Sequence, residues 1–81
     1  MTKQQFIDWA KSKGWKQDKF GHLQKETNEI YYRRFKLSNI AVRYEKQITF
    51  SDGKHEWIRI TSGYYKDLSI NSEGKLSGMK R

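Results

Sequence analysis

The chain has 81 residues, a formal net charge of +8 and no cysteine. This length allows one domain with one small core, and the lack of thiols excludes a disulfide framework and a thiolate metal site. Charged residues make up 32% of the chain, but 15% of it is aromatic, whereas disordered chains are poor in aromatic residues, so we expect a single folded domain over residues 1–81.

The first predicted element is a helix over residues 3–13. Thr2 and Gln5 have the spacing of a capping box, in which each side chain pairs with the other's free backbone N–H. Gly14 suits the left-handed conformation that ends many helices. Apolar residues recur between them at helical spacing and form one stripe, which comprises Phe6, Ile7, Trp9 and Ala10.

From Trp15 onward the pattern changes to β structure. The segments WKQDKF and HLQKET flank Gly21 and predict a first strand or hairpin, and Asn28-Glu29 predicts a turn before a strand in IYYRRFKL. The segment IAVRYEKQITF alternates most clearly between apolar and polar residues. The turn SDGK and the strand HEWIRIT follow, and the last part predicts a small hairpin around the turn Asn71–Gly74, with Leu68, Ile70 and Leu76 beside it.

These elements together predict an α+β fold. We expect one N-terminal helix packed on a twisted antiparallel sheet of about four to five strands in a meander, followed by a short C-terminal hairpin. Gly63-Tyr64-Tyr65-Lys66-Asp67 is an aromatic turn, and we expect its rings to close one end of the core.

The first central turn predicts which residues face one another. If Ser38-Asn39 is a two-residue turn, Phe35 pairs with Val42, and Arg34 pairs with Arg43.

The second central turn offers two registers. A two-residue Asp52-Gly53 turn would put Ile58 and Ile60 on the polar side, whereas a three-residue loop of Ser51-Asp52-Gly53 keeps them on the apolar side. We therefore expect the longer loop, with Gly53 in a left-handed conformation. It pairs Ile60 with Tyr44, Ile58 with Lys46, and Arg59 with Glu45.

This register separates two faces of the sheet. The face away from the helix gathers basic and aromatic side chains around Glu45; they are Tyr32, Arg34, Arg43, Trp57 and Arg59. The other face is expected to pack under the helix with Phe35, Leu37, Val42, Tyr44, Ile48, Ile58 and Ile60. Arg33, Lys46 and Glu56 also fall on that side and must lie near strand ends, where long stems reach water.

The basic face predicts a non-enzymatic nucleic-acid-binding module. Arg34 and Arg43 would repel each other across a strand pair, and a DNA or RNA phosphate would relieve that repulsion while Tyr32 or Trp57 stacks on a base. The predicted site is therefore Tyr32, Arg34, Arg43, Trp57 and Arg59. A lysine series is a second candidate for phosphate contact or simply keeps the domain soluble; it comprises Lys11, Lys13, Lys16, Lys19 and Lys25.

Two alternatives to nucleic acid remain open. The same face or an open sheet edge could receive a protein partner or a second copy of the chain, or the face could be only solvated. Catalytic, cofactor and metal patterns are lacking: His22 and His55 are the sole histidines and have no metal-ligand spacing. We therefore expect no enzyme activity, no cofactor and no metal site.

The opening order of a helix, Gly14-Trp15, Gly21-His22 and strands resembles the HicA-type toxin ribonucleases, small basic proteins with a double-stranded-RNA-binding-like fold. That family carries its catalytic histidine just after a Gly-Ser pair, so the resemblance implies a small ribonuclease that depends on His22. The sequence departs from the pattern, because no serine separates Gly21 from His22 and no second helix follows the predicted strands.

The sequence contains no indication of a membrane protein. No apolar run approaches the roughly 20 residues that a transmembrane helix needs, and the stretch MTKQQFIDWAKSKGW lacks the continuous apolar segment of a signal peptide. We expect a cytoplasmic protein with no membrane partner.

Overall fold

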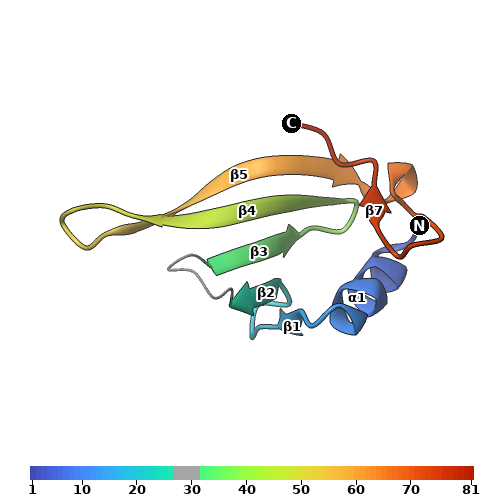
Figure 1. The fold of residues 1–81 in the computed structure, drawn as a ribbon, viewed down its shortest axis with the longest axis horizontal. Coiled ribbons are helices and arrows are strands. Elements are labelled where there is room, and N and C mark those ends of the chain that lie inside the picture. The colour runs from blue at the N-terminus through green and yellow to red at the C-terminus, as the bar shows by residue number, and fades with distance from the viewer. Residues whose placement is uncertain (27–31) are drawn as a thin grey trace.

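The computed structural model describes residues 1–26 and 32–81, and it confirms the expected α+β fold (Figure 1). The elements are α1 (Lys3–Ser12), β1 (Lys16–Gln17), β2 (Leu23–Glu26), β3 (Tyr32–Leu37), β4 (Ala41–Thr49), β5 (His55–Tyr64), a 3-10 turn (Tyr65–Asp67), β6 (Ser69–Ile70) and β7 (Leu76–Ser77). Strands β1 to β5 form one antiparallel sheet in sequence order, and β6 pairs with β7. The turn predicted at Asn28-Glu29 lies outside the described residues.

Helix α1 begins and ends where local signals predict it. The Thr2 hydroxyl accepts a hydrogen bond from the Gln5 amide at 3.1 Å, and the Gln5 side chain accepts one from the Thr2 amide at 2.8 Å. Lys13 caps the other end, and Gly14 follows with a φ of +93°, a conformation that costs glycine little. The capping box and the terminating glycine are both confirmed.

The first hairpin, β1–β2, is also confirmed. The Asp18 carboxylate accepts hydrogen bonds from the amides of Phe20 and His22, both at 2.9 Å. An aspartate that holds its own turn in this way brings Lys16 opposite Gln24 at the edge of the sheet.

The turn between β3 and β4 lies one residue later than expected. Ser38 pairs with Ala41 through backbone and side-chain hydrogen bonds, so Asn39 and Ile40 form the turn. Leu37 therefore faces Val42, and the predicted pairing of Phe35 with Val42 is wrong. The register changes by two residues, which leaves every side chain on its predicted face.

The loop between β4 and β5 has the predicted three residues. The Phe50 amide donates to the Lys54 carbonyl at 2.8 Å, and Gly53 has a φ of +84°. The pairs Glu45–Arg59 and Lys46–Ile58 follow from this loop. The predicted pairing of Ile60 with Tyr44 is wrong, because a β-bulge at Ile60 places Thr61 opposite Tyr44.

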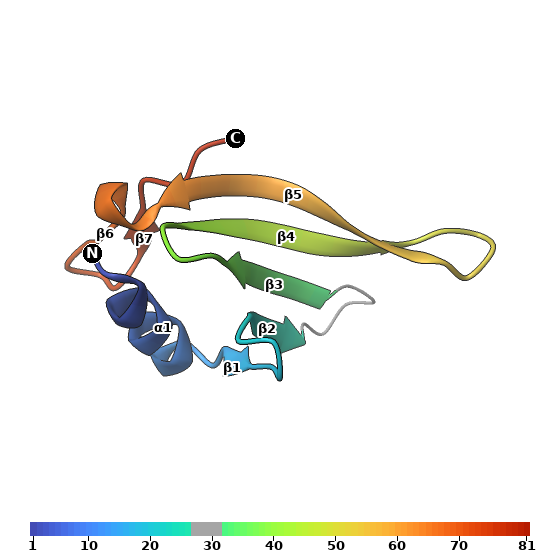
Figure 2. The same ribbon diagram turned by 180° about the vertical axis from the view of Figure 1, so that it is seen from behind.

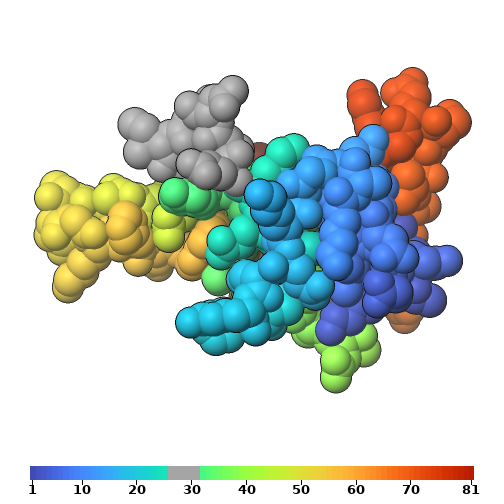
Figure 3. Space-filling view, turned by 90° about the horizontal axis from the view of Figure 1, so that it is seen from below, coloured from blue at the N-terminus to red at the C-terminus, as the bar shows by residue number. Residues whose placement is uncertain are grey.

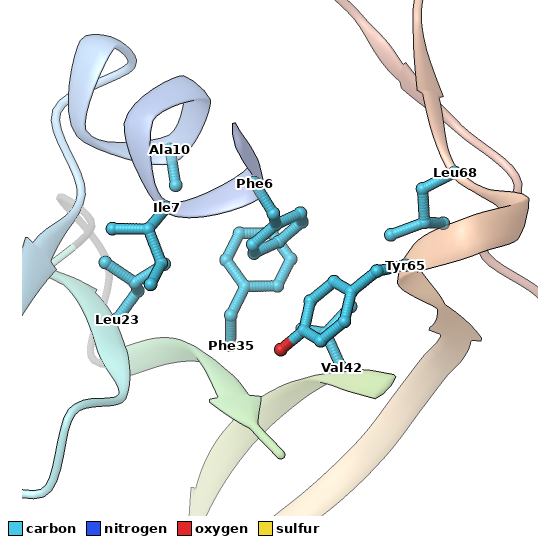
Figure 4. Packing of buried hydrophobic residues seen from close by; sticks show 8 residues of the cluster. All are labelled: Phe6, Ile7, Ala10, Leu23, Phe35, Val42, Tyr65 and Leu68. Carbon is cyan, nitrogen blue, oxygen red and sulfur yellow. The ribbon is translucent and has the colours of Figure 1, made fainter. Parts of the chain in front are cut away.

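The core lies where α1 crosses one end of the sheet (Figure 4). It consists of Phe6, Ile7, Ala10, Leu23, Phe35, Val42, Tyr65 and Leu68. The Phe6 and Phe35 rings meet edge to face with centroids 4.9 Å apart, and Trp15 lies 4.3 Å from Phe35. Each fully buried apolar side chain of this kind contributes roughly 1.5–3 kcal/mol.

The β4–β5 hairpin extends beyond the helix (Figures 1, 2 and 3). The isoleucines of its outer part therefore do not pack under α1. A ten-residue helix is about 15 Å long, whereas the ten residues of β5 span about 33 Å. Ile58 is 38% exposed, and the expectation that Ile48, Ile58 and Ile60 join the core is wrong. This open end also lets Arg33 and Lys46 reach water on the helix side.

The C-terminal residues return to the helix and to β5. The expected hairpin around Asn71–Gly74 is confirmed, with Ile70 opposite Leu76. The Trp9 indole donates to the Gly74 carbonyl at 2.8 Å and joins this hairpin to α1. Farther on, Lys80 pairs with Ser62 on the outer edge of β5 through bonds of 2.7 and 2.8 Å. No helix within residues 1–26 and 32–81 is long and apolar enough to cross a membrane.

Candidate nucleic-acid interface

The predicted site residues all lie on the side of the sheet away from α1, because paired and alternate residues share a face. We call this side the far face; it carries Tyr32, Arg34, Lys36, Arg43, Glu45, Trp57 and Arg59. Arg34, Glu45 and Arg59 face one another across three strands. Tyr32 is 43% exposed and presents an aromatic ring near the open end.

Glu45 lies at the centre of the far face and is only 3% exposed. Its Oε1 accepts from Arg34 Nε at 2.7 Å, and its Oε2 lies 3.5 Å from Arg43 Nη2. Charged groups are rarely buried without such partners. The expectation that Arg34 directly faces Arg43 is wrong: the two arginines share a carboxylate, so they do not need a phosphate to relieve their repulsion.

Trp57 packs against Arg34, the residue that is bonded to this carboxylate. The Arg34 guanidinium carbon lies 4.2 Å from the centroid of the Trp57 ring, within the range of a cation–π contact. The indole is half-buried and one of its faces carries the guanidinium. Tyr32, rather than Trp57, is therefore the more open ring for stacking on a base.

Three further cations lie on the far face; Lys16 was predicted as part of the lysine series, whereas Lys36 and Lys80 were not identified from the sequence. Lys36 faces Arg43, and Lys16 faces Gln24, which in turn faces Arg34. Alternation along β3 could have revealed Lys36, since it lies two residues after Arg34. Lys80 pairs with Ser62 over a long sequence separation, and no local pattern indicates such a contact.

The far face is therefore strongly cationic. Six basic residues share this face with one buried carboxylate; they are Lys16, Arg34, Lys36, Arg43, Arg59 and Lys80. Other lysines of the N-terminal series point elsewhere: Lys25 donates to the Lys13 carbonyl at 3.2 Å, and Lys19 lies 5.0 Å from the Phe20 ring centroid. Strand pairing puts Lys16 on the far face and Lys25 beside Arg33 on the opposite face, although both residues line one hollow with Tyr32.

The His22 side chain is hydrogen-bonded to the backbone of β3. Its Nδ1 accepts a hydrogen bond from the Leu37 amide at 3.0 Å, which places the proton of the neutral ring on Nε2. His55 lies beside Thr49 at a strand end, with 2.9 Å between Nδ1 and the hydroxyl. Among the described residues, no second helix follows the strands and no cluster of metal-ligating side chains occurs.

Comparison with known proteins gives no match to a family model, to a curated protein or to a solved structure.

Proposed function

We propose that the protein binds single-stranded nucleic acid through the far face. The observation that carries this proposal is the gathering of six cations and an exposed Tyr32 on one open side of the sheet. Single strands bind such surfaces with phosphates on Lys and Arg and bases on aromatic rings. A groove-reading helix is not needed, and α1 packs its apolar stripe into the core.

Glu45 supports the proposal as a positioning residue. A carboxylate repels phosphate, but Glu45 is covered and contacts two arginines. Its bond to Arg34 uses Nε and leaves the two terminal Nη groups out of that contact. A guanidinium held in place before binding loses less side-chain entropy when a phosphate arrives.

Arg59 gives the sharpest test, because it is exposed and faces Glu45 across the strands without a direct salt bridge. We expect Arg59→Gln to weaken binding of a ten-nucleotide single strand about three- to tenfold at 0.1 M salt. We also expect the slope of log affinity against log salt to fall by roughly 0.7. Fluorescence anisotropy of a labelled strand measures both quantities.

The control removes one positive charge from α1. Lys11→Gln is expected to change the affinity less than twofold, since Lys11 lies on an exposed helix position rather than on the far face. Equal losses in the two variants would mean that net charge alone drives binding. A parent protein that leaves the anisotropy unchanged would reject the proposal.

A protein partner is the second candidate, and the outer edge of β5 favours it. From His55 to Thr61, the described residues pair this strand with β4 alone, and open strand edges are templates for pairing with another chain. Sedimentation velocity over a range of concentrations tests self-association, for which a single monomeric species at all concentrations would be the negative result.

A further inference from the structure

A hollow of about 650 Å³ opens at the end of the far face that lies next to Arg43. It forms where β4 and β5 meet the C-terminal residues, which run along β5 in Figures 1 and 2. Its lining includes Arg43, Ser62, Tyr64, Asp67, Lys80 and Arg81. A volume of this size is in the range of small-molecule sites.

Strand pairing brings a hydroxyl between two cations in this hollow. Ser62 faces Arg43 on one side and Lys80 on the other, so the three side chains point to the same face. Neighbouring strands lie about 4.8 Å apart, which lets both cations reach one bound group. A guanidinium, an ammonium and a hydroxyl are typical donors to a phosphate.

Tyr64 supplies an aromatic surface beside these donors. It is 53% exposed and faces the small residue Ala41, so no large side chain on β4 covers its ring. Lys66 Nζ lies 5.9 Å from the ring centroid. Stacking of a base on an exposed ring of this kind contributes roughly 1–3 kcal/mol.

The charge of the hollow favours an anion. Three of the side chains that line it are cationic, those of Arg43, Lys80 and Arg81, and one is anionic, that of Asp67. Two backbone hydrogen bonds between Ser62 and Lys80, of 2.7 and 2.8 Å, fix the position of the Lys80 backbone beside β5. The phosphate donors and the stacking ring thus all belong to residues whose backbone is paired with a neighbouring strand.

We propose that the hollow binds one nucleotide, with the phosphate between Arg43 and Lys80 and the base against Tyr64. The inference builds on the proposed function, because it adds a separate subsite where a strand crossing the far face would end. The shared ligand chemistry is a nucleoside phosphate monoester, which occurs both as a free nucleotide and as the phosphorylated end of a strand.

The test is an NMR titration of the ¹⁵N-labelled full chain with adenosine monophosphate, and with adenosine as the ligand without phosphate. We expect the nucleotide, and not adenosine, to shift the amide signals of Ser62 and Lys80. We expect Lys80→Gln to weaken nucleotide binding about five- to tenfold and Tyr64→Leu about fivefold, whereas Lys11→Gln changes it less than twofold. All three side chains are exposed, and the spectrum of each variant reports its fold directly.

Oligonucleotides with and without a terminal phosphate distinguish the two sources. Tighter binding of the phosphorylated strand, abolished by Lys80→Gln, would assign the hollow to a strand end. If the hollow binds the nucleotide but the protein binds no oligonucleotide, the nucleotide site is supported and the proposed function is rejected. If oligonucleotides bind while adenosine monophosphate leaves Ser62 and Lys80 unshifted, this inference is overturned and the proposed function stands.

Discussion

Two polar side chains, Glu45 and Tyr65, are buried in different parts of the molecule, and each has its own partner. Glu45 lies on the far face in contact with Arg34 and Arg43, whereas Tyr65 lies in the core and donates from its hydroxyl to the Ser38 carbonyl at 2.9 Å. A buried polar group that keeps a hydrogen bond costs little, and one that loses its partner costs about 1–3 kcal/mol. Both residues therefore restrict where their neighbours lie.

Tyr65 makes the stability of the fold sensitive to alkaline pH. Burial raises the pKa of Tyr65 to about 12 from an ordinary value of 10, so the proton is held more tightly in the folded chain than in the unfolded one. The stability that this provides is complete below pH 10 and is lost as the pH rises toward 12. Between pH 9 and 11.5 we expect the parent to lose about 2 kcal/mol more than Tyr65→Phe, as measured by urea unfolding. Equal losses in both proteins would contradict the assignment.

At the scale of elements, the sequence predicted correctly those helix ends and turns that are stabilised by contacts between residues close in the chain. Thr2 and Gln5 satisfy each other within one turn, and Gly53 lies within its own loop. The turn at Asn39-Ile40 could not be placed in this way, because distant Tyr65 bonds both the Ile40 and the Ser38 carbonyls. The register therefore depends on a residue that follows the whole of β5.

The C-terminal segment depends on the conformation of Gly78. Its φ is +103°, and a Cβ there would collide with the Asp67 carbonyl oxygen. We expect Gly78→Ala to release the pairing of Lys80 with Ser62, because the backbone must move. Amide hydrogen exchange should then show a loss of protection at Ser62 of tenfold or more, which corresponds to about 1.4 kcal/mol.

Gly53→Ala is the matched control for that substitution. Gly53 has a φ of +84°, but nothing lies within 4 Å of an added Cβ, so only the left-handed conformation is penalised. We expect a cost of roughly 1–2 kcal/mol in global stability and no selective loss at Ser62. Retained protection of Ser62 in Gly78→Ala would show that the segment accommodates the side chain.

At the scale of the whole molecule, the sequence predicted which face of the sheet each side chain lies on, but not which of these side chains other elements bury. Alternation assigned Trp57 and Ile58 to opposite sides, and this part of β5 pairs with β4 in the predicted register. Coverage depends on the length of α1 relative to β5, which leaves Ile58 outside the core. Glu45 is likewise buried in contact with Arg34, which in turn packs on Trp57, and no sequence pattern encodes that arrangement.

The net charge of +8 on a small domain makes self-repulsion a term in its stability. Salt screens exposed charges over a Debye length that falls from about 10 Å at 0.1 M to about 3 Å at 1 M. The pairing of Glu45 with Arg34 is largely buried and is screened much less. We therefore expect the melting temperature to rise by about 2–6 °C between 0.05 and 0.5 M sodium chloride, measured by circular dichroism. The melting temperature of Arg59→Gln, which lacks one exposed positive charge of the far face, should rise less. A fall in melting temperature would instead mean that attraction around Glu45 outweighs the repulsion among the six far-face cations.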